Sequence, residues 1–381
     1  MDFTYDEEQQ ALREAVRGLL GKAYSDYENR RRTVAEDPGF SEQLWRQLAE
    51  MGVLGLPFEE RYGGMGAGPI EVGIVAQELG RVLAPEPFLS AVVLAGGAVA
   101  AAGTDEQRTQ LLEALSSGEQ LLAFAHQEPG ARWQPTASAV TASGSGSSWT
   151  LSGVKEPVLH GARADVLVVS AALPDGGTGL FLVDGSASGL GRDGYSTSEG
   201  GRAARVSFTD TPATPLGAAE DRTDVIAQVL DAGRIAVGNE ALGLMEVALE
   251  TTSAYLKSRK QFGVTLNTFQ ALTFRAADMY VSLELARSVV TWATMVLAEK
   301  SSGAEVATAA SRASLAVSRS GRHVGQEAIQ LHGGIGMTAE YSIGSYTSRL
   351  TALDHLLGDG NHHLGRLAAT VGRYDEVEPL P

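Results

Sequence analysis

The stretch from Tyr255 to Met279 carries side chains that could bind a flat cofactor with phosphate groups. A guanidinium can hold a phosphate through two parallel hydrogen bonds, an aromatic face can stack on a planar ring, and an amide can pair with the edge of that ring. Arg259, Phe262 and Gln270 supply these three groups, and Gly263 supplies a backbone that turns freely. We therefore expect a dinucleotide cofactor at this corner. The alternative is an ordinary helix corner with a solvated basic pair.

Composition narrows the chemistry that remains. Cysteine is absent from the 381 residues, which excludes disulfides, thiolate nucleophiles and cysteine-ligated metal or iron–sulfur sites. The chain holds 30 basic and 46 acidic residues, a formal net charge of −16, which argues against a nucleic-acid or anionic-membrane partner. The start has no signal-peptide pattern, and no run reaches the roughly 20 apolar residues of a membrane span. We expect a soluble, cytoplasmic protein.

The residues before about 117 have helical periodicity. A capping-box spacing between Thr4 and Glu7, followed by apolar residues at helical intervals, predicts a first helix over about 6–20. Ser41 begins another helical pattern, and a glycine-rich loop at 61–69 follows it. Further patterns include helices over about 90–102 and 105–116. We assign residues 1–117 to an N-terminal helical domain.

From Leu121 onward the pattern changes to short strands separated by Gly, Ser, Pro and Asp clusters. The small, polar tract at 141–148 is typical of a hairpin tip. We assign residues 118–220 to a middle β-barrel or β-sandwich domain. Four long helical patterns follow, over about 223–257, 267–299, 305–331 and 341–371. Helices of similar length with short connections predict a C-terminal four-helix bundle over 221–381, so the fold class is α+β.

This order of domains, together with the motif at 255–279, resembles the acyl-CoA dehydrogenase family of flavoproteins over essentially the whole chain. The likeness includes the blocks MDFTYDEEQQALREAVR at 1–17, LAEMGVLGLPFEERYGGMGAG at 48–68 and ELGRVLAPEPF at 78–88. The resemblance implies FAD as the cofactor, lying between the β domain and the bundle. It also implies that the adenosine half of FAD reaches a neighbouring subunit of a dimer within a tetramer.

The resemblance assigns roles to two blocks of the bundle. Arg259, which Gln261 follows closely, would pair with the pyrophosphate of FAD, Phe262 would pack on the cofactor, and Gln270 would assist from the next helix. The second block reads QLHGG and consists of Gln330, Leu331, His332, Gly333 and Gly334. There the backbone of a Gly-Gly turn would approach the adenosine of the partner's FAD. A glycine at this place is also a good helix C-cap in its own right.

Two pieces of the β domain resemble the family's flavin-ring contacts, and both are altered. The first has a glutamine at the usual threonine position, with GARW in place of the following glycine and serine; its residues are Phe124, His126 and Gln127. In the second the family's tryptophan, aliphatic and hydroxyl positions are Pro157, Val158 and Leu159. A stacking indole and a hydroxyl donor are therefore missing, and backbone groups would supply the contact.

Desaturation of an acyl thioester requires a carboxylate that removes the α-proton. The family's usual glutamate corresponds to Asp359 if two residues are inserted after the Gly-Gly turn, and otherwise to Leu357. Some relatives carry the base on the first bundle helix, where the equivalent position is Gly233 and Glu240 lies two turns further on the same face, in surroundings that we expect to be apolar. Asp359 is our first candidate for the base and Glu240 the second. Alternatively, Asp359 only terminates a helix and Glu240 is structural.

The resemblance implies an enzyme that desaturates an acyl-CoA substrate and passes electrons to an electron-transfer flavoprotein. Two alternatives stay open: a non-catalytic or half-site subunit of a heteromeric acyl-CoA dehydrogenase, and a flavin monooxygenase of the same superfamily. A homo- or hetero-oligomer is expected. A metal is not expected, because paired histidines on a terminal helix are usually surface or interface residues; the residues concerned are Asp354, His355, Asp359, His362 and His363.

Overall fold

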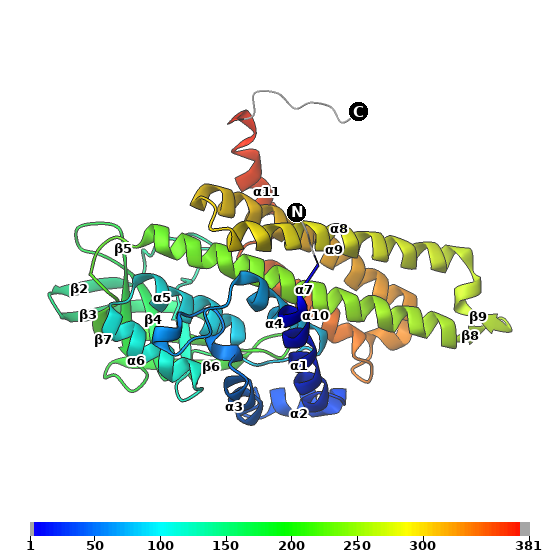
Figure 1. Ribbon diagram of the computed structural model, residues 1–381, viewed down its shortest axis with the longest axis horizontal. Coiled ribbons are helices and arrows are strands. Elements are labelled where there is room, and N and C mark those ends of the chain that lie inside the picture. Colours follow the sequence, from blue (N-terminus) through cyan, green and yellow to red (C-terminus); the bar gives the residue numbers. More distant parts are fainter. Residues whose placement is uncertain (1–3, 374–381) are drawn as a thin grey trace.

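The computed structural model describes residues 4–373, and its first third is helical (Figure 1). The helices are α1 (Glu7–Ala23), α2 (Tyr27–Ala35), α3 (Glu42–Glu50), α4 (Pro69–Arg81), the π-helix η3 (Phe88–Gly96), α5 (Gly97–Ala102) and α6 (Asp105–Ser116), with short 3-10 turns η1 (Val53–Gly55) and η2 (Glu60–Tyr62). Ser41 caps α3 as predicted, because its hydroxyl accepts the backbone N–H of Leu44.

Two details of this region differ from the prediction. The cap of α1 is Asp6 and not Thr4: the Asp6 carboxylate accepts the backbone N–H of Gln9 at 2.8 Å, and the Gln9 side chain accepts the N–H of Asp6 at 3.2 Å. Aspartate is favoured over threonine at this position, and its charge complements the helix dipole. The single helix predicted over 90–102 is a π-helix followed by α5. π-Helical turns are rare and often occur at functional sites.

A closed sheet follows, made of β1 (Leu122–Ala125), β2 (Thr141–Ser145), β3 (Ser148–Leu159), β4 (Val166–Ala172), β5 (Thr178–Asp184), β6 (Leu190–Ser196) and β7 (Arg202–Pro215). The pairings β4–β2, β2–β3, β3–β7, β7–β5 and β5–β4 form a ring, with β1 beside β4 and β6 beside β7. The ring encloses a core of its own that includes Leu151, Val169, Phe181 and Val206. The predicted hairpin tip is the β2–β3 turn.

The last third is a bundle of α7 (Thr223–Ser258), α8 (Gln270–Ala298), α9 (Gly303–His332), α10 (Ile343–Leu356) and α11 (Gly360–Ala368), with 3-10 turns η4 (Leu266–Thr268), η5 (Gly333–Met337) and η6 (Val371–Arg373). The fourth predicted helix is wrong in one respect, because it breaks between α10 and α11. Gly358 has φ +126°, which no helix accommodates, and Asp359 starts the next helix. The α+β fold class with helical, β and helical parts is confirmed, and the exact domain boundaries stay predictions.

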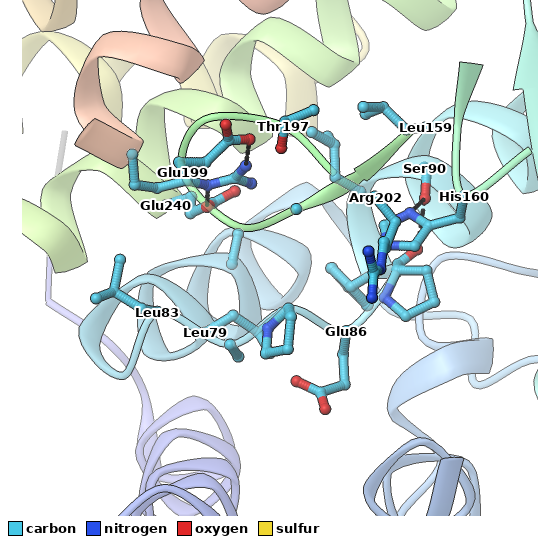
Figure 2. A pocket seen from close by; sticks show the side chains of 18 of the residues that line it. Leu79, Leu83, Glu86, Ser90, Leu159, His160, Thr197, Glu199, Arg202 and Glu240 are labelled. Atoms are coloured by element: carbon cyan, nitrogen blue, oxygen red, sulfur yellow. Dashed lines mark hydrogen bonds and ion pairs between the residues drawn. The ribbon is translucent and has the colours of Figure 1, made fainter. Parts of the chain in front are cut away.

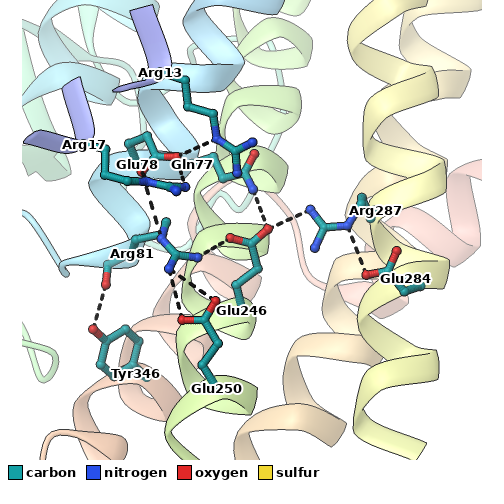
Figure 3. A network of polar contacts seen from close by, with 10 residues as sticks. All are labelled: Arg13, Arg17, Gln77, Glu78, Arg81, Glu246, Glu250, Glu284, Arg287 and Tyr346. Atoms are coloured by element: carbon teal, nitrogen blue, oxygen red, sulfur yellow. Dashed lines mark hydrogen bonds and ion pairs between the residues drawn. The ribbon is translucent and has the colours of Figure 1, made fainter. Parts of the chain in front are cut away.

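A network of ion pairs joins α1, α4, α7 and α8 (Figure 3). Glu78 of α4 is buried and accepts Arg17 of α1 at 2.7 Å. Arg81 of α4 binds Glu246 of α7 at 2.6 Å, and the same carboxylate accepts Arg287 of α8 at 2.7 Å. Removing one member of such a network leaves a buried charge unpaired, so the network specifies how the N-terminal helices sit on the bundle.

α8 is apolar on average. Among residues 4–373 it is the one helix that is long and apolar enough by length and composition to cross a membrane, although charged residues interrupt it and it contains no run of about 20 apolar residues. This is weak support for a span, since core helices of soluble proteins pass the same test of length and composition. Exposed apolar side chains of α8 include Phe274, Tyr280, Val281 and Leu285. Phe274, Val281 and Leu285 follow one another at helical spacings of seven and four, so they lie on one face, and an exposed apolar face is typical of a subunit contact.

Candidate active site

A hairpin at the C-terminal end of α7 presents Phe262 to solvent. β8 (Lys260–Gln261) pairs with β9 (Val264–Thr265), and the turn residues Phe262 and Gly263 have φ values of +53° and +83°. Positive φ at both central residues is the geometry of a type I′ turn, which glycine adopts freely and a bulky residue rarely. The Phe262 side chain is 91% exposed. A strained, exposed aromatic at a hairpin tip suggests a binding role.

The other predicted cofactor residues of this corner are exposed as well. Arg259 is the C-cap of α7, and its guanidinium makes no ion pair or side-chain hydrogen bond within residues 4–373. Gln261 and Gln270 are also exposed. α8 begins at Gln270, three residues after the predicted start at Asn267, because η4 (Leu266–Thr268) comes first. A guanidinium, an aromatic ring and two amides therefore share one surface.

The second predicted contact lies at the same end of the bundle. The His332 ring at the end of α9 stacks on the Tyr255 ring of α7, with centroids 4.5 Å apart. His332 and Leu331 are buried, and burial lowers the pKa of His332, so these two side chains pack inward and do not face a ligand. The members of the block that stay exposed are Gln330, Gly333 and Gly334. Any contact through this block is therefore made by these residues and the backbone.

The strand ends predicted to contact a flavin ring border a different cavity, near the N-terminal end of α7. Its volume is about 30 Å³. The lining residues include Phe124, His126, Gln127, Pro157, Leu159, Leu230, Leu356 and Leu357. Val158 alternates with these residues along β3 and is buried in the barrel core, so its side chain cannot reach a ligand there.

The His126 side chain is already engaged by the barrel. Its ring nitrogens lie 2.9 Å from the Ser170 hydroxyl and 2.7 Å from the Gln134 carbonyl. Burial, aided by the charge of nearby Lys155, lowers the pKa of His126 to about 4. His126 is therefore neutral at physiological pH, and it reaches the cavity mainly as part of the wall.

A buried lysine fixes the end of β1. Lys155 is fully buried and donates to the His126 carbonyl at 3.0 Å, the Ser170 hydroxyl at 3.0 Å and the Glu128 carboxylate at 2.8 Å. Burial lowers the pKa of Lys155 to about 8. Burial also opposes ionisation of Glu128, but the hydrogen bond and charge of Lys155 outweigh it and lower the pKa of Glu128 to about 2. All three ammonium donors have an acceptor, so the group has a structural role.

Asp359 does not line this cavity. Its carboxylate caps α11 by accepting the backbone N–H of His362 at 2.8 Å, and it lines a separate cavity between α9 and the α10–α11 break. Asp359 starts α11, whereas the alternative prediction was that it terminates a helix; a capping role fits this geometry better than a role as base. Among residues 4–373, no cluster of three or more His, Cys, Asp or Glu side chains could hold a metal ion.

Gly233 and Leu357, the positions that the resemblance aligns with the base when no insertion is assumed, meet at the cavity beside the strand ends. A Cβ built on Gly233 would lie 3.0 Å from Leu357 Cδ1 and 2.6 Å from Leu94 Cδ2, and both leucines line the cavity. Glycine and leucine cannot accept a proton. The described residues that line the cavity include no carboxylate.

Glu240 faces a neighbouring polar cavity (Figure 2). Arg349 of α10 donates to Glu240 at 2.7 Å and contacts Glu199 at 3.3 Å. The expected apolar surroundings are therefore wrong, because a guanidinium supplied from a distant helix pairs with the carboxylate. The ion pair makes Glu240 a link between α7 and α10. Ser90 lines both cavities, with its hydroxyl 2.9 Å from His160 Nδ1.

The exposed corner and the strand-end cavity are too far apart for one ligand to touch both. Leu230 lines the cavity, and Arg259 follows it along α7 by 259 − 230 = 29 residues. At 1.5 Å per residue this is about 44 Å, farther than one dinucleotide extends. Figure 1 shows the sheet at one end of α7 and β8–β9 at the other. A cofactor bound at the corner therefore places its far half on another chain.

Residues 6–119 match the family model described as acyl-CoA dehydrogenase, N-terminal domain, and residues 223–372 match the C-terminal domain of the same family. The chain belongs to the acyl-CoA dehydrogenase family. It is 30% identical to the short-chain specific acyl-CoA dehydrogenase of Clostridium acetobutylicum, over 90% of this chain and 92% of that protein.

Two solved structures of this family are similar along nearly the whole chain. A variant of the Tcur3481-Tcur3483 steroid ACAD is 33% identical with a TM-score of 0.88, and the match covers 96% of this chain and 98% of that chain. The ChsE4-ChsE5 complex from Mycobacterium tuberculosis is 27% identical with a TM-score of 0.89, covering 99% and 100%.

Members of the acyl-CoA dehydrogenase family are oxidoreductases that act on CH–CH bonds, and FAD is the cofactor. The exposed corner fits the phosphate half of FAD, because Arg259 is free to pair with it and Phe262 is free to pack on it. The strand-end cavity of about 30 Å³ does not fit the flavin ring. The residues of this chain therefore fit the phosphate half of FAD and not its ring.

Two contacts that shape the strand-end cavity were not predicted. Gln127 Nε2 donates to the Leu356 carbonyl at 2.6 Å, and Trp133 Nε1 donates to the His355 carbonyl at 3.1 Å. The sequence contains one signal for each contact, because a glutamine and a tryptophan occupy positions where the family usually has smaller residues. Their partners lie more than 200 residues away, and the spacing of residues does not reveal such pairs.

Proposed function

We propose that this chain is the half-site subunit of a heteromeric acyl-CoA dehydrogenase that desaturates an acyl-CoA thioester at the α,β position. The observation that carries the proposal is the meeting of Gly233 and Leu357 at a cavity without a carboxylate, in a chain whose FAD-binding corner is exposed and unpaired. Removal of the α-proton requires a base within hydrogen-bond reach of the substrate. In this proposal a paralogous chain supplies the base.

The residues of this chain bind and orient the shared cofactor. Arg259 pairs with the pyrophosphate, because its planar guanidinium can donate two parallel hydrogen bonds to phosphate oxygens. Phe262 packs on the cofactor from the hairpin tip, and Gln270 contacts it from the start of α8. FAD supplies the acceptor for the β-hydrogen, which leaves as hydride while the base takes the α-proton. Electrons then pass to an electron-transfer flavoprotein, a partner named for some relatives.

The names of two similar structures support a two-chain enzyme. The Tcur3481-Tcur3483 steroid ACAD and the ChsE4-ChsE5 complex are each named for two polypeptides. The exposed apolar face of α8 is available for such an assembly. The alternative of a self-sufficient dehydrogenase would need Asp359 or Glu240 as base, and one caps a helix while the other is paired with Arg349.

The experiment compares the chain purified alone with the chain co-expressed with a base-bearing paralogue. We expect the chain alone to hold little FAD. The pair should show the absorption of oxidised flavin, and an acyl-CoA should bleach it in the absence of oxygen. The bleaching should persist when this chain carries Asp359→Ala.

Two results would contradict the proposal. If the chain alone retains FAD, is bleached by acyl-CoA and loses the bleaching in Asp359→Ala or Glu240→Gln, it is a self-sufficient dehydrogenase. If acyl-CoA never bleaches the flavin but the reduced flavin reacts rapidly with oxygen, the chain is a monooxygenase.

A further inference from the structure

Three consecutive carbonyls at the end of α10 accept hydrogen bonds from side chains that are distant in sequence. The last carbonyls of a helix have no donor within the helix and must find partners elsewhere. The His355 carbonyl accepts Trp133 Nε1 at 3.1 Å, and the Leu356 carbonyl accepts Gln127 Nε2 at 2.6 Å. The Leu357 carbonyl accepts Arg234 Nε at 2.8 Å. The end of β1 and the loop after it are therefore tied to the α10–α11 break.

Trp133 holds this position against its backbone preference. Its φ is +62°, a value that a bulky residue rarely adopts. The ring centroid lies 5.3 Å from that of His362 near the start of α11, and the Arg132 guanidinium lies 5.7 Å from the Trp133 ring centroid. Such an outlier persists where the surrounding contacts over-determine it, and it is found most often at functional sites.

The Gln127 contact narrows the strand-end cavity, and the Trp133 contact holds the same helix end from outside the cavity lining. Gln127 and Leu356 both line it, and the hydrogen bond between them runs from the strand end to the helix end. The remaining space of about 30 Å³ has room for one or two water molecules. An acyl thioester cannot enter without breaking this bond.

We propose that Gln127 and Trp133 exclude the acyl thioester from this chain's own cavity and so determine which half of the assembly binds substrate. The inference rests on the proposed function, because it concerns the half that lacks a base. A thioester bound beside Gly233 and Leu357 could not lose its α-proton. A closed cavity keeps the acyl thioester from binding where no base can remove its α-proton.

The test measures how many molecules of an acyl-CoA thioether analogue bind to the assembled enzyme by titration calorimetry. We expect one per pair of unlike chains in the natural protein, and a second, weaker site in the Gln127→Ala/Trp133→Gly variant. Glycine at 133 relieves the positive φ, which favours folding of the variant. The matched control is Trp149→Ala, since Trp149 also donates through its indole to a carbonyl, that of Gly146 at 3.0 Å, but in the β2–β3 turn. The control should keep one site.

A second measurement covers the case in which the variant does not assemble. Hydrogen exchange on the full chain alone should show faster exchange at 358–362 in Gln127→Ala/Trp133→Gly than in Trp149→Ala. The inference would be overturned if the natural assembly bound two analogue molecules per pair of unlike chains. It would also be overturned if the double variant assembled, showed faster exchange at 358–362 and still bound only one. Unchanged exchange at the break would overturn it as well. None of these outcomes decides the proposed function, which is tested separately by flavin bleaching of the chain alone, of the pair and of the Asp359 variants.

Discussion

The two ends of α7 differ in whether the polar side chains around them have partners. At the Arg259 end a guanidinium, an aromatic ring and two amides are exposed and have no side-chain partners within residues 4–373 other than the Phe262–Phe269 ring contact. At the Leu230 end the polar groups are paired over long sequence distances, and the cavity has nearly closed. Exposed unpaired groups are available to a ligand, whereas satisfied ones stabilise the fold. In the proposed assembly, this chain therefore contributes the phosphate end of a cofactor site and not the end that holds the flavin ring.

We call the Leu230 end of α7 the closed end and the Arg259 end the open end. The largest effect on the free energy of unfolding is expected at the closed end, where Lys155 is a buried charge. Lys155→Met removes the donor to His126, Ser170 and Glu128 and leaves the Glu128 carboxylate buried with only backbone donors and Ser138. Breaking one partner of a buried pair costs about 3–5 kcal/mol, so the free energy of unfolding should fall by that amount in urea titrations. Adding Glu128→Gln should recover much of the loss. A cost below about 1 kcal/mol would mean that the closed end is not held by this lysine.

The sequence allowed most of the fold to be predicted, because its periodic patterns are long. The bounds of α6, α7 and α9 agree with the predictions within a few residues, since apolar spacing and caps determine them locally. The predicted helix over 341–371 ran through Gly358, and only the alternative in which Asp359 ends a helix placed a break there, because glycines within a helical pattern also fit a continuous helix.

The candidate site was predicted less completely, because it depends on pairs across the fold. Arg259 and Phe262 were identified from a local motif, and the hairpin presents both. Glu240 was expected in apolar surroundings, yet Arg349 reaches it from 109 residues away. No local pattern specifies such a partner, and the same holds for Trp133 at the end of α10.

The polar cavity beside the closed end should make stability depend on pH. Glu86 is buried, and burial raises its pKa to about 7 despite hydrogen bonds from Tyr24 and Ser41. A raised pKa means that the folded state binds the proton more tightly, so the contribution is complete below about pH 4.5 and is lost as the pH rises through 7. At 1.36 kcal/mol per pKa unit the loss is about 3 kcal/mol. Urea titrations from pH 5 to 8 should show this slope, and Glu86→Gln should flatten it.

The control for this pH effect is Glu106→Gln, which alters an exposed carboxylate in the first turn of α6. Its slope should equal that of the natural chain. If Glu86→Gln leaves the slope unchanged, Glu86 is ionised throughout the range and the cavity admits water freely.

Substitutions at the open end should change the affinity for FAD and leave the free energy of unfolding nearly unchanged. Arg259→Ala removes a charged donor that contributes about 1.5–3 kcal/mol to a paired phosphate, so FAD should bind the assembled enzyme about 10- to 100-fold more weakly. Its free energy of unfolding should stay within about 0.5 kcal/mol, since Arg259 has no side-chain partner in the described part of the chain. Lys257→Ala removes a nearby exposed cation and should leave FAD affinity nearly unchanged. Equal effects of the two variants on flavin fluorescence titrations would remove the distinction between the two ends.

The smallest effect separates capping from catalysis at Asp359. Asp359→Ala loses the acceptor for the His362 N–H and should lower the free energy of unfolding by about 1 kcal/mol, whereas Asp359→Asn keeps an acceptor and should change it by a few tenths. In the assembled enzyme both variants should be bleached by acyl-CoA at the natural rate, because the carboxylate faces a different cavity from Leu357. An asparagine variant that folds normally but loses bleaching would show that Asp359 turns toward the substrate. The closed end would then be a working active site that opens on binding.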